Sequence, residues 1–310
     1  MASNPKVVAF GGGHGLAATL SALRQVTNEI TAVVTVADNG GSSGRLREEF
    51  NSLPPGDLRM ALAALCSDDQ WGRSWAEILQ YRFTSSGPMN NHALGNLLLT
   101  ALWDRDGDQV KGIERVGELL KIVGRVLPMA LDPLDIEATF DTENGDQRVR
   151  GQVQVATTKG RIKSLRLIPE APRATPEVAQ AIIDADWITF GPGSWFSSVM
   201  PHFLLKEQNQ LITESLAKKI IIFNLEEDAN AGEFAGNSGS EHLKLVLDHI
   251  PDLKIDYAVA DSSVAISDRT LAKLVEGCGG ELILGDFALK NGQNHHDTKK
   301  LASTFTHIFS

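Results

Sequence analysis

Short apolar runs alternate with amphipathic stretches along most of this chain. Residues 7–10 and 30–36 are β-branched runs typical of strands, and residues 16–26 between them carry leucines at helical spacing. This order predicts a β-α-β unit. Further helices are expected at 57–65, 71–81, 92–103 and 177–184, and further strands at 187–190, 220–225, 257–260 and 282–284. The alternation predicts a Rossmann-like α/β fold, a doubly wound, mostly parallel sheet in an α/β/α sandwich.

The hydrophobic pattern changes to period two between residues 134 and 168. Apolar residues alternate through 149–155 and 162–167, with turn-forming residues at 143–146 and 158–160. We expect a small antiparallel β meander there, inserted into the α/β body. The chain has no internal repeat and no low-complexity stretch, so residues 1–310 are interpreted as one domain that contains this insert.

Composition narrows the range of partners. The net charge is −10, with 29 basic and 39 acidic residues, and no basic stretch alternates with aromatic residues, so a nucleic-acid partner is not expected. No apolar run approaches the ~18 residues that span a bilayer, and we expect no secretory signal in the first residues. Two cysteines are too few for a disulfide framework. We expect a cytoplasmic protein that binds a small molecule; a homo-oligomer and a regulatory protein partner stay open.

Three glycine-rich loops follow predicted strands, and each could close its backbone amides on an anion. Loop 1 is Gly11, Gly12, Gly13, His14 and Gly15; loop 2 is Asp38, Asn39, Gly40, Gly41, Ser42 and Ser43; loop 3 is Gly191, Pro192, Gly193 and Ser194. Because the carboxyl ends of parallel strands share one edge of a sheet, the loops are expected to meet in a cleft for a nucleotide or sugar phosphate. Ordinary turn geometry is the alternative explanation of these glycines.

Loop 1 also fits a dinucleotide-binding fingerprint. The pattern aligns at Gly13, Gly15 and Ala18, and Asp38 then ends the second strand where a ribose-binding acid would lie. This alternative predicts a nicotinamide or flavin enzyme. Loop 2 argues against it, because a ribose-binding acid does not require a second anion loop followed by arginines.

Charged residues near the loops extend the candidate site. Arg45 and Arg47 are two residues apart and should diverge, with Arg45 in the cleft and Arg47 in solvent. Asp57 could cap the helix that it begins. Arg59 lies in the first turn of that helix, where a cation opposes the dipole and calls for a ligand or an acidic partner, unless it is an ordinary surface arginine.

His92 and Asn96 are four residues apart and would share one face of a helix, pointing into the cleft. The alternative is that His92 satisfies a buried backbone group. Two other polar runs are not expected to bind metal. Residues 226–228 are interpreted as an exposed acidic loop, and residues 295–297 as a solvated turn.

Five segments together resemble a known bacterial family. They are GGGHGL at 11–16, VTVADNGGSSGRLR at 34–47, PPGDLR at 54–59, HALGNLLL at 92–99 and GPGS at 191–194, and the similarity resumes at 296–297. They resemble the gluconeogenesis-factor family, the YvcK-like branch of the CofD-like superfamily. The resemblance implies a protein that binds UDP-sugars such as UDP-N-acetylglucosamine and is needed for cell shape and growth on gluconeogenic carbon. The related branch, 2-phospho-L-lactate transferase, moves a phospholactyl group from a guanylyl donor to Fo with magnesium.

Several positions depart from the family pattern. The usual pair of aspartates after the second strand is Asp38 and Asn39 here, which weakens the transferase alternative. The loop threonine is His14, and the residues after Asn224 and at His295 also differ. The expected ligand is a UDP-sugar, with no cofactor required. Its diphosphate would lie across Gly12, Gly13, Ser42, Ser43 and Gly193 near Arg45, and Asp38 would accept hydrogen bonds from hydroxyls or contact a magnesium ion.

Overall fold

The computed structural model describes residues 4–143, 145–225, 238–289 and 295–310. Its centre is a seven-stranded sheet in the order β10-β9-β8-β7-β1-β2-β3, with every neighbouring pair parallel. The strands are β1 (Val7–Gly11), β2 (Ile30–Val34), β3 (Arg125–Pro128), β7 (Trp187–Phe190), β8 (Lys218–Ile222), β9 (Tyr257–Asp261) and β10 (Glu281–Gly285). The central strands are buried along their whole length, as strands covered on both faces must be.

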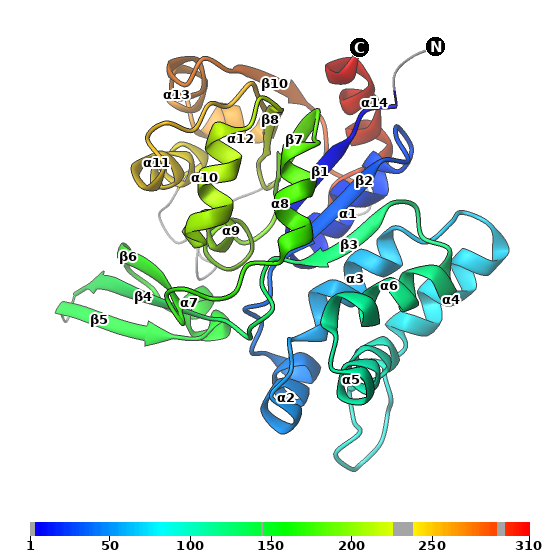
Figure 1. Cartoon of the computed structure of the whole chain (residues 1–310). Coiled ribbons are helices and arrows are strands. Elements are labelled where there is room, and N and C mark those ends of the chain that lie inside the picture. The colour runs from blue at the N-terminus through cyan, green and yellow to red at the C-terminus, as the bar shows by residue number, and fades with distance from the viewer. Residues whose placement is uncertain (1–3, 144, 226–237, 290–294) are drawn as a thin grey trace.

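Helices cover both faces of the sheet and confirm the expected α/β class (Figure 1). On one face lie α8 (Pro176–Ile183) and α10 (Lys206–Glu214); on the other, α1 (Gly13–Leu23) packs against α3 (Pro55–Ala64) and α14 (Thr298–Phe309). The remaining helices are α2 (Gly41–Phe50), α4 (Gln70–Gln80), α5 (Leu94–Asp106), α6 (Gln109–Leu120), α7 (Gln152–Thr157), the π-helix η1 (Trp195–Val199), α9 (Met200–Leu204), α11 (Gly239–His249), α12 (Ser262–Ser267) and α13 (Leu271–Gly277). Within the described residues, no helix is long and apolar enough to cross a bilayer.

The strand order reverses beside β1. From β1 the chain moves outward through β2 to β3, and it then returns to β7 on the other side of β1 before continuing to β10. In open parallel sheets, ligands bind outside the carboxyl ends of the strands at such a reversal. The loops after β1 and β7 therefore flank the position where a ligand site is expected.

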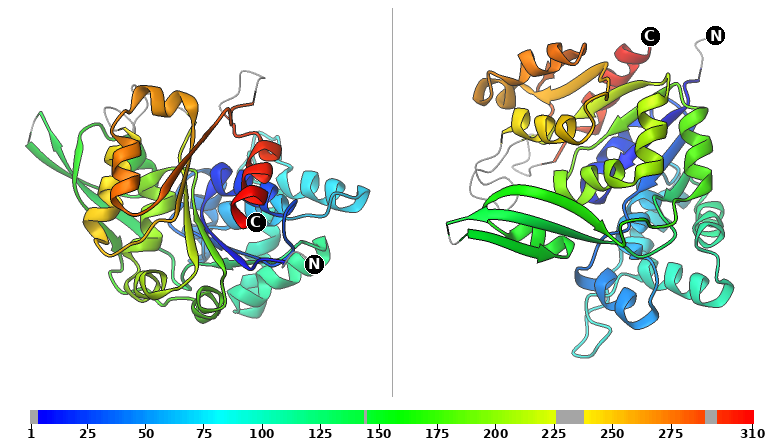
Figure 2. Two further views of the ribbon diagram at one scale, coloured as in Figure 1. Left: turned by 90° about the horizontal axis from the view of Figure 1, so that it is seen from above. Right: turned by 60° about the vertical axis from the view of Figure 1, so that its left-hand side comes forward.

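The expected insert is a second, antiparallel sheet with the strand order β5-β4-β6, and it extends from the body of the molecule (Figure 2). Its strands are β4 (Asp135–Thr142), β5 (Gly145–Arg150) and β6 (Arg161–Ile168). The prediction of strand through 149–155 is wrong for its second half, where α7 forms. The chain turns at Gly151, which has φ 106°, and Asn39 Oδ1 accepts a hydrogen bond from the Val153 N–H in the first turn of α7.

The predicted helix at 92–103 starts two residues later than expected. Arg82 and Ala93 form an antiparallel bridge, so α5 begins at Leu94 and leaves His92 in the preceding segment. The expected sharing of one helix face by His92 and Asn96 is therefore wrong, although both side chains still reach the same hydroxyl group, as described below.

Candidate functional site

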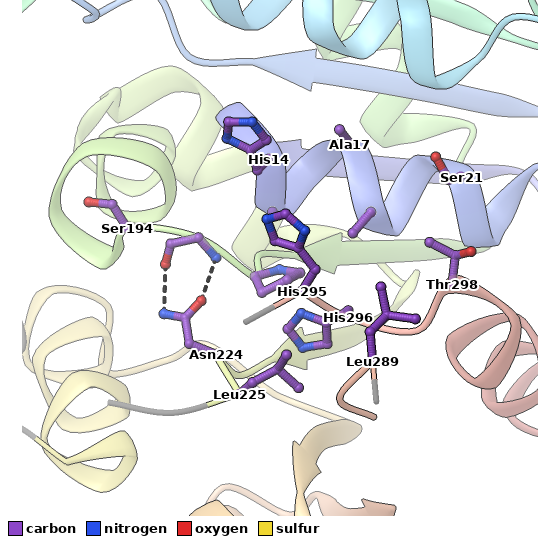
Figure 3. Close-up of a pocket in the computed structure, with 14 residues that line it drawn as sticks. His14, Ala17, Ser21, Ser194, Asn224, Leu225, Leu289, His295, His296 and Thr298 are labelled. Carbon is purple, nitrogen blue, oxygen red and sulfur yellow. Dashed lines mark hydrogen bonds between the residues drawn. The ribbon is translucent and has the colours of Figure 1, made fainter. Parts of the chain in front are cut away.

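A pocket of about 490 Å³ opens at the reversal of the strand order, between the first turns of α1, loop 3 and the segment before α14 (Figure 3). Six predicted site residues line it: His14, Gly15, Pro192, Gly193, Ser194 and Asn224. The other described residues in its wall are Ala17, Ala18, Ser21, Leu225, Leu289, His295, His296 and Thr298. Loops 1 and 3 thus meet at one cavity.

Loop 3 is fixed by the side chain of Asn224, which follows β8. The Gly193 N–H donates to Asn224 Oδ1 at 2.9 Å, and Asn224 Nδ2 donates to the Gly193 carbonyl at 2.9 Å, the two bonds drawn in Figure 3. On the other side of loop 3, a Cβ added to Gly15 would clash with the Pro192 carbonyl. Gly15 therefore allows loop 3 to pack closely against α1. In the dinucleotide fingerprint the corresponding glycine allows a pyrophosphate to approach, so Gly15 gives no support to that alternative.

Three histidines form one wall of the pocket. The rings of His14 and His295 are parallel within 12°, with centroids 6.1 Å apart. His296 Nε2 lies 3.2 Å from the Phe223 carbonyl, and burial lowers the pKa of His296 to about 4, so this ring is neutral at pH 7. His295 is exposed as expected, but the prediction of a solvated turn is wrong for the next two residues: His296 is half-buried, and Asp297 caps α14. The resumed family resemblance at 296–297 was the signal that these residues return to the site.

Asp57 holds loop 1 instead of capping α3. The N-cap of α3 is Pro54, and the Asp57 carboxylate accepts a hydrogen bond from the Gly13 N–H. A Cβ on Gly12 would lie 2.5 Å from Asp57 Oδ2. Burial, and then the charge of Asp38, raises the pKa of Asp57 to about 7. The expected capping role of Asp57 is therefore wrong, and its carboxylate takes the amide of loop 1 nearest to the start of α1.

Asp38 lies close to Asp57, and its Oδ1 accepts a hydrogen bond from the Gly40 N–H at 2.8 Å. Two neighbouring carboxylates suit a divalent cation that keeps water or ligand phosphates as its other ligands. Within the described ranges, no group of three or more His, Cys, Asp or Glu side chains is arranged to hold a metal. Residues 226–228, expected to form an acidic loop, lie outside the described residues.

Arg59 is buried, with only 3% of its surface exposed, so its interpretation as an ordinary surface arginine is wrong. Its Nη1 donates to Gln80 Oε1, and its stem passes Gly95, where an added Cβ would lie 2.8 Å from Arg59 Cγ. Burial, and then the charge of Arg82, lowers the pKa of Arg59 to about 10, while Asp57 and Asp38 act in the opposite direction. Arg59 therefore stays charged at pH 7 in a largely dry environment.

Ser42 joins loop 2 to the start of α5. Its Oγ lies 3.0 Å from His92 Nδ1 and accepts a hydrogen bond from Asn96 Nδ2 at 2.9 Å. All three side chains are buried. Ser43 Oγ accepts a hydrogen bond from the Gly56 N–H at 3.0 Å, which joins the first turns of α2 and α3. In this structure these side chains position loop 2, and the loop offers a ligand mainly its backbone.

Two further predicted side chains are directed away from the pocket. Arg45 donates from Nη1 to the Pro88 carbonyl at 2.6 Å and from Nη2 to the Asn90 carbonyl at 2.7 Å. Arg47 does not face solvent as expected, because it forms an ion pair with Asp135 at 2.7 Å and is mostly buried. The two arginines do diverge, and the guanidinium of Arg45 is engaged outside the cleft.

A family model for 2-phospho-L-lactate transferase CofD matches residues 7–298, from β1 to the first residue of α14, and so includes every loop described above. The chain belongs to the CofD family. A Mycobacterium tuberculosis protein is 44% identical over 304 residues, covering 96% of this chain and 88% of that one. A Listeria monocytogenes protein named "Gluconeogenesis factor" is 33% identical over 311 residues, covering 97% and 94%. The Mycobacterium tuberculosis protein is named "Putative gluconeogenesis factor".

Solved structures agree with this assignment. The structure of a UPF0052-family protein from Bacillus halodurans superposes on this CofD-family chain with a TM-score of 0.83 at 31% identity, covering 97% of this chain and 98% of that one. The expected relationship to gluconeogenesis factors and to the CofD superfamily is confirmed. One departure from the family pattern has a structural role: Asn39 Nδ2 donates to Gln154 Oε1 at 3.0 Å, which joins loop 2 to α7 of the insert.

Proposed function

We propose that this CofD-family protein binds a nucleotide-activated sugar, a UDP-sugar such as UDP-N-acetylglucosamine, and acts as a cytoplasmic regulatory protein. The observation that carries this proposal is the pocket of about 490 Å³ at the strand reversal, bounded by two glycine loops. Its volume is within the range of small-molecule sites, roughly 300–1,000 Å³. The names of the relatives support a role in gluconeogenesis. We extend that role to this chain, together with the cell-shape function that the family resemblance implies.

The chemistry of the pocket supports a ligand with an aromatic end and an anionic end. Leu225, Leu289 and the ring of His295, which lies parallel to that of His14, offer apolar and aromatic surface to a base. The start of α2 also has backbone amides that could bind an anion, because its N-cap is Gly40, which has no side chain to cap it. Loop 2 and α2 do not line this pocket, so the expected meeting of all three loops holds only for loops 1 and 3. Magnesium is not required for this mode, but Asp38 and its neighbouring carboxylate would hold it together with ligand phosphates.

Thermal unfolding with and without ligand tests the proposal. UDP-N-acetylglucosamine at 100 times its dissociation constant should stabilise the protein by about 2.7 kcal/mol. For 310 residues this corresponds to a rise in Tm of about 4 °C. Asn224→Ala removes the side chain that fixes loop 3 and should lose most of this rise, whereas Asn28→Ala, an exposed residue at the opposite edge of the sheet, should keep it. The absence of a rise with every UDP-sugar, with or without magnesium, would contradict the proposal.

The family model favours a second candidate, a CofD-like phospholactyl transfer. The neighbouring carboxylates of Asp38 and Asp57 are consistent with it, because magnesium-dependent transfer needs acidic ligands. Incubation with magnesium, a guanylyl phospholactate donor and Fo, followed by mass spectrometry, distinguishes the two functions. A joined product formed with turnover would replace the regulatory interpretation, and its absence together with UDP-sugar binding would support it.

A further inference from the structure

Arg59 carries a buried charge that forms no ion pair within the described part of the chain. Its Nε has no hydrogen-bond partner, and its Nη1 is bonded to the neutral amide oxygen of Gln80. The neighbouring carboxylates of Asp57 and Asp38 are directed to the backbone amides of Gly13 and Gly40. A buried cation without an ion-pair partner and with an unbonded Nε costs stability, which makes Arg59 a candidate for ligand binding.

Arg82 brings a second guanidinium to the same place. It lies two residues after Gln80, the partner of Arg59, and its bridge to Ala93 places it beside the start of α5. Gly95, two residues after Ala93, packs against the aliphatic part of the Arg59 side chain. Arg82 is exposed and donates from Nη1 to the Asn91 carbonyl at 2.9 Å, so the other N–H groups of its guanidinium are available to a ligand.

His14 connects these arginines to the pocket. It stands in the first turn of α1, which packs against α3, and it lines the pocket wall. Partial burial, and then the charges of His295, Arg59 and Arg82, lowers the pKa of His14, although the residue keeps an exposed face. Neither arginine lines the pocket itself, so His14 is the member of this group that does.

We propose that Arg59, Arg82 and His14 form a phosphate-binding subsite at the end of the pocket marked by His14, and that this subsite, in place of Arg45, receives the diphosphate of the ligand. The inference rests on the proposed function, since it assigns the anionic part of the nucleotide sugar. Two guanidinium forks match the several oxygens of a phosphate group, and hydrogen bonds between charged groups are about twice as strong as neutral ones. The guanidinium of Arg45 donates to two backbone carbonyls, so Arg59 and Arg82 are the arginines proposed to bind the diphosphate.

Calorimetric titration of the full chain with UDP-N-acetylglucosamine, UDP, pyrophosphate and uridine tests the subsite. Arg82→Gln should weaken the binding of the three phosphate-containing probes at least tenfold and leave uridine unchanged. Arg73→Gln is the matched control, because Arg73 is also exposed and also bonds a backbone carbonyl, at the far end of α4. Arg59→Lys keeps the charge but loses the fork, and it should weaken the same three probes severalfold.

The outcomes separate this inference from the proposed function. If UDP-N-acetylglucosamine binds the wild type and Arg82→Gln equally well, the subsite is overturned and the proposed function stands. If pyrophosphate binds in a manner that requires Arg82 but no UDP-sugar binds, the subsite stands and the proposed function fails. Loss of uridine binding in Arg82→Gln, with its fold intact by circular dichroism, would show that Arg82 acts on the whole pocket and would also overturn the subsite.

Discussion

Replacing Asp57 with asparagine separates the charge of this side chain from its hydrogen bond to loop 1. The asparagine Oδ1 still accepts from the Gly13 N–H, but the side chain is neutral at every pH. In the wild type, burial and the charge of Asp38 raise the pKa of Asp57 from 3.8 to about 7. The folded state therefore binds this proton more tightly than the unfolded state does. The resulting stability is complete below about pH 4 and is lost as the pH rises through 7.

The size of the effect follows from the shift. About three pKa units correspond to about 4 kcal/mol in the free energy of unfolding, fully lost only above pH 7. This is an upper bound, because Asp57 keeps some exposure to water. Asp57→Asn should therefore gain on the wild type by up to roughly 2.5 kcal/mol between pH 5 and pH 8. At pH 8 the full difference of up to about 4 kcal/mol applies, so the variant should unfold up to about 6 °C higher than the wild type for a chain of 310 residues.

Urea denaturation followed by circular dichroism at pH 5, 6, 7 and 8 measures this difference. Asp104→Asn is the control, because Asp104 is exposed on α5 and its replacement removes the same formal charge. The control should run parallel to the wild type at every pH. The assignment of a proton to Asp57 would be refuted if the difference in stability between Asp57→Asn and the wild type stayed constant over this range. It would also be refuted if the variant lost stability relative to the wild type as the pH rises.

Three further substitutions test the packing of the loops. Gly15→Ala places a Cβ against the Pro192 carbonyl and should cost more than about 2 kcal/mol by urea denaturation, with loss of UDP-sugar binding. Ser42→Ala leaves the buried groups that bond its hydroxyl unpaired and should cost about 1–3 kcal/mol. Asn224→Asp places a carboxylate beside the Gly193 carbonyl and should weaken UDP-sugar binding about tenfold, with recovery as the pH falls below 5; equal affinity at pH 7 would contradict the role of this clamp.

The order of elements was predictable from the sequence because hydrophobic period and glycine placement are local signals. Six of the seven strands of the central sheet were located, since each is a short apolar run that ends at a glycine or a polar residue; β3 (Arg125–Pro128), which has only four residues, was not predicted. The pattern failed at 152–157, where Val153 and Val155 are two residues apart as in a strand. There the alternation is overridden by the turn at Gly151 and by the contact with Asn39, neither of which a two-residue period records.

The loops of the site were predictable for the same reason, but the partners of their side chains were not. Arg82 had no motif to mark it, because its importance comes from the bridge to Ala93 that carries it back beside Arg59. His295 and His296 lie some 280 residues from loop 1, and only the fold brings α14 against α1. Long-range contacts of this kind depend on packing, so a local spacing rule does not reveal them.

Asp57 and Arg59 show how one helix turn supplies two opposite functions. The two residues are two positions apart, so their side chains leave α3 in different directions. Because α3 is wedged between α1 and α5, both directions end at functional elements: Asp57 reaches the amide of Gly13, and Arg59 passes Gly95 toward Arg82. The Gly13 amide at the start of α1 is thus bonded to the Asp57 carboxylate, and the positive charges of Arg59 and Arg82 lie further from loop 1. A diphosphate that followed the dinucleotide-binding mode would meet Asp57, whereas one displaced toward Arg59 would meet positive charge, so the charge distribution supports the proposed second position.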